Sequence, residues 1–345
     1  MFAIMKVLII ACIGGALFAQ LHIPIPWMLG PIVFVMLTQF IYKGALKWPA
    51  PFLNIGVVIV GTVIGIQFDT SLFNQMGSLL LYMVLVNVIL IGGALLIAQC
   101  TSKWTGLPMK VAILGAIPGG LSQTVAFALE EKITDISTIT YFQIIRLLLV
   151  VMIVPFIVSG EAISKPVTDA SMSFTLVALI ALSWCVSYVT NRVHLPVAFF
   201  ITPIMFVLTL QLTTPIAMPA IPEYTMVVAQ VLIGAHIGLM LKPHMLKFPK
   251  RVLVGGVMSA LALILLTIGS SYLMMGLMGT SFVSSFLSAA PGGLDQMVLL
   301  AEAIHADVSL VSMFQTFRLL FIFLCIMPIL KIAFRRKSLA LQENT

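Results

Sequence analysis

Two arginines lie inside long apolar runs, and each follows a glutamine by three residues. The first pair is Gln143 and Arg146, and the second is Gln315 and Arg318. Residues three apart share one face of a helix, and each arginine lies about ten residues into its run, or about 15 Å along a helix. An arginine at that depth of a bilayer is costly and tends to face a cavity or a partner. We therefore predict that both arginines contact a bound ligand, with an ion pair inside the protein as the alternative.

A glycine loop precedes each of these pairs. The loops are Pro118-Gly119-Gly120-Leu121 and Pro291-Gly292-Gly293-Leu294, and proline followed by two glycines interrupts a helix. Irregular backbone within a bilayer survives only where it is buried in protein or lines a wet cavity. The helix after each loop would direct its N-terminus at that cavity, where N–H groups and the helix dipole favour an anion. Close packing of two backbones is the alternative interpretation.

A polar pair opens the helix after each loop, and the pair differs between the two copies. Ser122 and Gln123 stand in the first copy, and Asp295 and Gln296 in the second. Two interpretations of Asp295 stay open: a carboxylate that binds a proton or sodium ion, or a cap at the start of its helix. The predicted substrate site comprises the loop glycines, the polar pairs and the Gln–Arg pairs, namely Gly119, Gly120, Ser122, Gln123, Gln143, Arg146, Gly292, Gly293, Asp295, Gln296, Gln315 and Arg318.

The composition places these residues in a lipid bilayer. The chain of 345 residues is 61% hydrophobic and 8% charged, whereas soluble domains carry about 25% charged residues. The net charge of +7 comes from residues in short loops, which is typical of membrane topology signals and not of nucleic-acid binding. The cysteines and histidines lack ligand spacing, and no nucleotide-binding or Ser/His/Asp motif is present. We therefore expect no metal, no other cofactor and no enzymatic activity.

The chain aligns with itself at a shift of 172 or 173 residues. The landmarks that match in order include Gly30-Pro31-Ile32 with Thr202-Pro203-Ile204, Gly61 and Gly65 with Gly234 and Gly238, both glycine loops, Asp135 with Asp307, and both Gln–Arg pairs. A repeat of this length indicates a duplicated unit. We predict a first repeat over residues 1–165, a second over 166–335 and a cytoplasmic tail over 336–345.

Each repeat is predicted to contain five membrane spans and one interrupted segment. The predicted spans are 2–20, 27–43, 53–68, 73–98 and 136–158, then 172–191, 197–213, 224–241, 250–278 and 308–333, and the interrupted segments are 106–131 and 281–304. Each arm of an interrupted segment has about ten residues, or about 15 Å, which is half of a hydrocarbon core of about 30 Å. Each interrupted segment is therefore expected to form a re-entrant hairpin.

The basic residues predict the orientation of the spans. With the N-terminus in the cytoplasm, five spans per repeat invert the second repeat, and of the 18 basic residues only Lys165 falls outside. This agrees with the positive-inside rule. The first span resembles a signal peptide in length, but its counterpart in the second repeat indicates an uncleaved span. The predicted fold is an all-α polytopic protein of the cytoplasmic membrane, with two inverted repeats and both termini in the cytoplasm.

The paired motifs resemble a known family. The Pro-Gly-Gly-Leu loop followed by Phe-Gln-x-x-Arg-Leu-Leu, at Phe142–Leu148 and Phe314–Leu320, is similar to the AbrB-type bacterial membrane family, and the resemblance covers about residues 1 to 335. Its members contain two AbrB duplication domains and have been labelled ammonia monooxygenases, regulators and, more recently, transporters. They are distinct from a DNA-binding regulator of the same name. The architecture, a five-span unit with a glycine-rich hairpin, also resembles the 2-hydroxycarboxylate transporters.

These observations predict a secondary transporter that moves a small organic anion by alternating access. Two helix N-termini and two arginines at one depth favour an anionic substrate, and coupling to protons or sodium would depend on Asp295. The alternatives are a membrane-bound monooxygenase and a regulatory membrane scaffold. The expected partners are the anion and the bilayer, with no nucleic acid, and whether the protein forms a homo-oligomer stays open.

Overall fold

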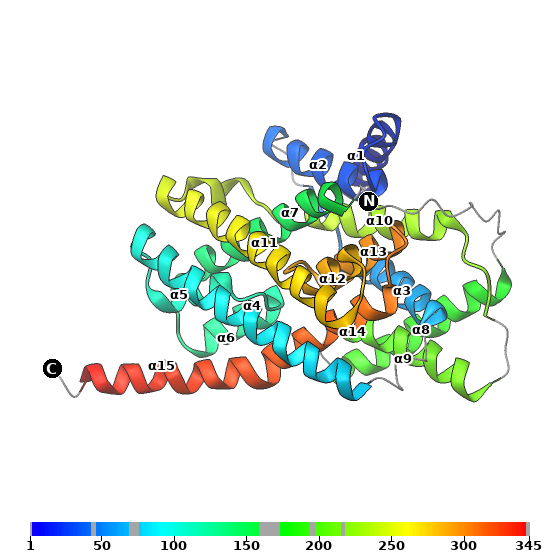
Figure 1. The fold of residues 1–345 in the computed structure, drawn as a ribbon. Coiled ribbons are helices and arrows are strands. Elements are labelled where there is room, and N and C mark those ends of the chain that lie inside the picture. Colours follow the sequence, from blue (N-terminus) through cyan, green and yellow to red (C-terminus); the bar gives the residue numbers. More distant parts are fainter. Residues whose placement is uncertain are drawn as a thin grey trace. The chain divides into compact units, whose positions relative to one another are not determined.

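The computed structural model describes residues 2–42, 46–68, 76–158, 173–193, 197–214 and 218–342, and every regular element within them is a helix (Figure 1). The helices of the first repeat are α1 (Phe2–Gln20), α2 (Pro26–Ile41), α3 (Ala50–Gln67), α4 (Met76–Thr105), α5 (Met109–Ala116), α6 (Leu121–Glu130) and α7 (Ile136–Val158). Those of the second are α8 (Phe174–Arg192), α9 (Ala198–Thr213), α10 (Glu223–Gly238), α11 (Lys250–Met278), α12 (Phe282–Ala289), α13 (Leu294–Ala303), α14 (Val308–Phe321) and α15 (Met327–Gln342). The order of elements is the same in both repeats, except that the second has a 3-10 helix at Pro243–Lys247 and its last span is divided into α14 and α15.

The predicted spans are confirmed as helices. Eight helical stretches of the described chain are long and apolar enough to cross a membrane, and the two remaining predicted spans are the shorter apolar helices α2 and α9. The protein is thus a multi-pass membrane protein. The last span differs from its prediction, because a π-helical turn at Ile322–Ile326 joins α14 to α15, and the helix continues to Gln342.

Both interrupted segments are confirmed as pairs of short helices. The arms α5 and α12 have 8 residues each, and α6 and α13 have 10 each. At 1.5 Å per residue these arms are about 12 and 15 Å long. The side from which each pair enters the membrane, and the inversion of the second repeat, remain predictions, and Lys165 lies outside the described residues.

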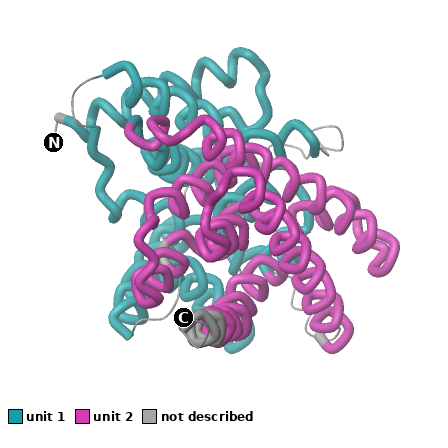
Figure 2. Tube along the Cα trace, turned by 90° about the vertical axis from the view of Figure 1, so that its left-hand side faces the viewer, with its two compact units in different colours: residues 1–73, 151–243, 294–312 teal, residues 74–150, 244–293, 313–345 magenta. Residues whose placement is uncertain are grey.

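The chain packs as two compact units, and each unit draws on both repeats (Figure 2). Unit 1 comprises Met1–Phe73, Val151–Pro243 and Leu294–Ser312, and unit 2 comprises Asn74–Val150, His244–Gly293 and Met313–Thr345. Unit 1 therefore holds the first three spans of each repeat. Unit 2 holds α4, α5, α6, α11 and α12, the Pro-Gly-Gly residues of both loops and both Gln–Arg pairs. The repeat boundaries at residues 165 and 335 remain predictions from the sequence.

Within unit 1, glycines of one repeat pack on the backbone of the other. A Cβ atom added to Gly61 of α3 would lie 2.8 Å from the Phe200 carbonyl oxygen of α9, and one added to Gly234 of α10 would lie 2.8 Å from the Met28 oxygen of α2. Gly65 and Gly238 make the equivalent approaches to Val207 and Val35. These small residues thus let the helix backbones approach closely.

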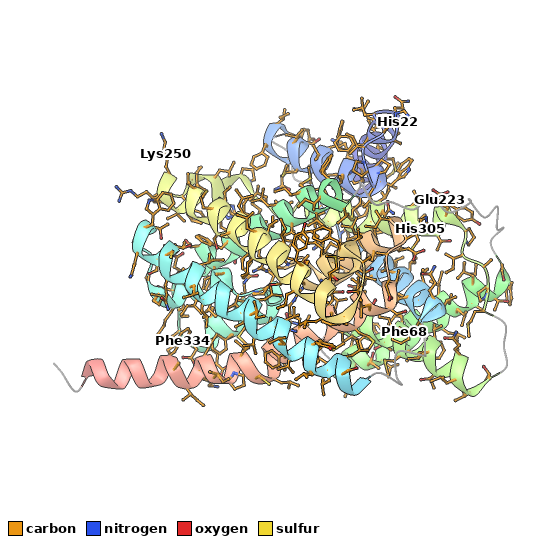
Figure 3. The ribbon with its side chains drawn as sticks, viewed as in Figure 1. His22, Phe68, Glu223, Lys250, His305 and Phe334 are labelled. Atoms are coloured by element: carbon orange, nitrogen blue, oxygen red, sulfur yellow. The ribbon has the colours of Figure 1, made fainter. Side chains whose placement is uncertain are left out.

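Unit 2 is built around α4 and α11, which pack on each other and support α5 and α12 respectively. An apolar cluster of α5, α6, α7 and α15 lies beneath the first glycine loop, and its members include Leu114, Ile117, Phe127 and Phe334. Figure 3 labels Phe334 on α15, where its ring lies 6.2 Å from that of Phe127. This cluster fixes the backbone that leads into and out of the loop.

Candidate functional site

The first glycine loop is held by Gln143 and Arg146 of α7. Helix α5 ends at Ala116, and its last carbonyl groups have no partner within the helix. Gln143 Nε2 donates to the oxygens of Leu114 (2.6 Å) and Ile117 (3.1 Å), and Arg146 Nη1 donates to the Ile117 oxygen (2.9 Å). The two side chains thus cap α5, and the guanidinium charge lies at the negative end of its dipole.

The second loop is held in the same way by Gln315 and Arg318 of α14. Gln315 Nε2 donates to the oxygens of Leu287 (2.6 Å) and Ala290 (3.1 Å), while Arg318 Nη1 donates to the oxygens of Ala289 (3.1 Å) and Ala290 (2.7 Å). In both repeats the glutamine also accepts a hydrogen bond from its own arginine through Oε1. The Gln–Arg pair therefore caps the C-terminal end of the short helix before the loop in both repeats.

Arg146 also reaches the loop of the other repeat. Its Nε donates to the Pro291 oxygen at 3.2 Å, while Arg318 Nη2 lies 3.4 Å from the neighbouring Gly292 oxygen. The first repeat's arginine therefore contacts Ile117, directly before the first glycine loop, and Pro291 in the second loop. Both loops and both arginines consequently meet in one place within unit 2.

This meeting point carries two buried positive charges. The side chains of Arg146 and Arg318 are 5% and 4% exposed. Within the described residues neither arginine lies at salt-bridge distance from a carboxylate, although Lys331 and Glu130 do pair. The internal ion pair, the alternative considered from the sequence, is therefore not formed. Carbonyl oxygens solvate both cations, and contact with a ligand remains a prediction.

The helix after the first loop begins without a side-chain cap. Gly120 is the N-cap of α6 and no acidic residue stands in its first turn. A Cβ added to Gly119 would lie 3.1 Å from Thr124 Oγ1, and one added to Gly120 only 1.7 Å from Gln123 Oε1. The atom close to Gly120 is the end of the flexible Gln123 side chain, which therefore folds back over the start of α6. The Ser122 side chain lies outside the described residues.

The helix after the second loop begins with its own carboxylate. Asp295 stands in the first turn of α13, and Gln296 Nε2 donates to Asp295 Oδ2 at 3.0 Å. Both interpretations of Asp295, a helix cap and a coupling carboxylate, remain predictions. Two further aspartates cap helices after the hairpins: Asp135 accepts from the Thr138 N–H (3.1 Å) and Asp307 from the Leu310 N–H (2.9 Å).

Unit 1 contains a cavity of about 970 Å³ that the sequence did not reveal. Its polar lining comes from three separate stretches of chain and includes Gln67, Glu223, Gln230, Glu302, His305, Asp307 and Ser309. Figure 3 labels Glu223 and His305 among them. Spacing along the sequence could not bring these residues together. They do not form a metal site, since no group of three His, Cys, Asp or Glu side chains in the described residues could hold an ion.

Comparison with known proteins identifies relatives across most of the chain. The chain is 24% identical to "Uncharacterized protein YhjN" of Bacillus subtilis (strain 168), covering 92% of this chain and 90% of that protein. It is 25% identical to "Putative regulator AbrB" of Escherichia coli (strain K12), covering 89% of each. The model of the family described as transition state regulatory protein AbrB matches residues 27–334. The chain therefore belongs to the AbrB family.

Proposed function

We propose that this protein is a secondary transporter that moves a small organic anion across the cytoplasmic membrane by alternating access. The observation that supports this proposal most directly is the pair of buried arginines, Arg146 and Arg318, which hold two loops that interrupt membrane helices. Among the described residues, no carboxylate lies at salt-bridge distance from either arginine. Buried charge in a membrane protein is costly and marks pathways or ligand sites. A transported anion would offset this charge when it binds.

In this proposal each arginine donates hydrogen bonds to loop carbonyls and also attracts the anion by its charge. Carbonyl oxygens already accept from each guanidinium, but a guanidinium has five N–H donors and retains its full charge when carbonyls solvate it. The bundle that carries the two loops would move against the remaining helices. Both termini would lie in the cytoplasm, and Asp295 remains the candidate for coupling to protons or sodium.

Flux in proteoliposomes tests the proposal. Purified protein would be reconstituted, and uptake of radiolabelled lactate, succinate and other small carboxylates would be followed under proton or sodium gradients. We expect saturable uptake that falls in the order wild type, Arg146→Lys, Arg146→Met, because lysine keeps the charge but not the planar fork. Thermal unfolding and size-exclusion profiles would verify that each variant is folded.

The same preparation distinguishes the alternatives. Anion binding without flux under any gradient would contradict transport and favour a membrane sensor, in line with the regulator named among the relatives. Stoichiometric copper or iron in the purified protein would favour the monooxygenase. If the protein neither bound nor transported any of the carboxylates, the proposal would lose its basis.

A further inference from the structure

We infer that the anion binds at the N-terminus of α6 in the first hairpin, where the hydroxyl of Thr124 contributes to its site, and that Asp295 fills the equivalent place on α13 as a built-in anion. This inference rests on the proposed function and deepens it. The two hairpins would then be unequal: one presents an anion site, and the other carries its own carboxylate.

The start of α6 has the properties of an anion-binding site. The helix has 10 residues, no side chain caps its N-cap Gly120, and its first turn contains no acidic residue. Its first N–H groups and the positive end of its dipole therefore favour an anion.

Thr124 provides a second and independent indication of a ligand. Its hydroxyl is buried, with the residue 0% exposed, and it has no hydrogen-bond partner among the described residues. The hydroxyl lies against Gly119, where an added Cβ would be 3.1 Å away. An unpaired buried hydroxyl costs about 1–3 kcal/mol, so a ligand oxygen that accepted from it would relieve this cost.

The start of α13 carries a carboxylate of its own, whereas the start of α6 does not. Asp295 places a carboxylate in the first turn of α13, and Gln296 donates to it. A second anion there would meet a like charge at close range, which is unfavourable. At the position of Thr124 the second repeat has Met297, which has no hydroxyl.

The charge near the first loop points to one carboxylate or a group of similar size. Arg146 donates to Ile117, the residue before Pro118 in that loop, so its positive charge lies near the start of α6. A short acceptor with two oxygens can bond to both a helix N-terminus and a hydroxyl. The ligand class is therefore a small carboxylate.

Binding measurements on purified full-length protein test this inference, with lactate and succinate as the probes. Thr124→Val, which keeps the shape and removes the hydroxyl, should weaken binding about tenfold. Ser122→Asp would copy the second repeat into the first and should abolish binding, while Ser122→Asn should retain more affinity because it adds no charge. Thr267→Val is the matched control, since it removes a buried hydroxyl of α11 that already donates to Leu263; it should leave affinity unchanged.

Two outcomes would overturn the inference while leaving the proposed function intact. In one, the wild type and Ser122→Asp bind and transport the probes equally. In the other, Asp295→Asn abolishes binding while Thr124→Val has no effect, which would place the anion at α13. A wild-type protein that neither binds nor transports any carboxylate would instead contradict the proposed function itself, and the inference with it.

Discussion

At the scale of the residue, the two arginines hold the backbone of the glycine loops in place. Each guanidinium donates to the carbonyl oxygens that end a short helix, and the glutamine three residues earlier occupies the neighbouring carbonyls. These carbonyls would otherwise be buried without donors, which costs about 1–3 kcal/mol each. A ligand role and a fastening role can coexist, because the loop backbone must be held in place before it can present helix termini to an anion.

Replacing Arg318 by methionine should destabilise the protein. Its carbonyl partners at Ala289 and Ala290 would lose a charged donor, and hydrogen bonds to charged groups contribute about 1.5–3 kcal/mol. We expect a clear fall in the thermal unfolding temperature in detergent. Arg192→Met is the control, because Arg192 is exposed and donates to Tyr188. Equal unfolding temperatures for both variants would contradict a fastening role for Arg318.

Part of this site could be predicted from residue types and spacing. The Gln-x-x-Arg pairs and both loops were identified because each occurs twice, and the arginine lies 29 residues after its carbonyl partner in both repeats. The contact from Arg146 to Pro291 could not be predicted, because it joins residues 145 apart and depends on tertiary packing. The unpaired hydroxyl of Thr124 was also missed, since only the burial of its neighbours makes an ordinary threonine unusual.

At the scale of the element, capping should set the stability of the helices that follow the hairpins. Asp135 accepts a hydrogen bond from the Thr138 N–H at the start of α7. Asp135→Ala should lower stability by about 0.5–2 kcal/mol, whereas Asp135→Ser should restore most of it, because serine is also a good N-cap. Thermal unfolding of the three proteins would measure this. A serine variant no more stable than the alanine variant would contradict the capping role.

The glycines that join α3 to α9 and α10 to α2 should tolerate no side chain. Gly61→Ala and Gly234→Ala would each place a Cβ 2.8 Å from a carbonyl oxygen, and overpacking costs about 1–3 kcal/mol. The matched control is Gly92→Ala in α4, where nothing lies within 4 Å, and alanine there should stabilise the helix by up to about 1 kcal/mol. Denaturation midpoints that fall equally for all three variants would contradict this packing.

Helix positions followed from the sequence more readily than helix partners did. Apolar run length located the spans, and the Pro-Gly-Gly breaks located the short arms, because both are local properties. The continuation of the last helix through a π-helical turn to Gln342 was missed, since the apolar run ends before the helix does. The partners of Gly61 and Gly234 could not be assigned in advance, because each lies in the other repeat.

At the scale of the whole molecule, duplication explains why each unit contains helices of both repeats. The packing of α3 on α9 and of α10 on α2 exchanges the same positions between repeats. Such an exchange relates equivalent surfaces as a two-fold interface does, so neither repeat completes unit 1 alone. Separately expressed halves, residues 1–165 and 166–345, should therefore be unstable apart, and co-expression should recover folded complex on size-exclusion chromatography. A stably folded single half would contradict this.

Inverted repeats predict that equivalent positions lie on opposite sides of the membrane. Lys103 near the end of α4 and Gly276 near the end of α11 are equivalent at a shift of 173, and a side chain at Gly276 would meet nothing within 4 Å. Cysteines would be introduced singly at both positions after the four native cysteines, all exposed, are replaced by serine. The positive-inside rule places Lys103 in the cytoplasm, so a membrane-impermeant maleimide should label position 276 on intact cells and position 103 only after permeabilisation. Labelling of both positions from the same side would show that the repeats are parallel, and the two hairpins would then enter from one side.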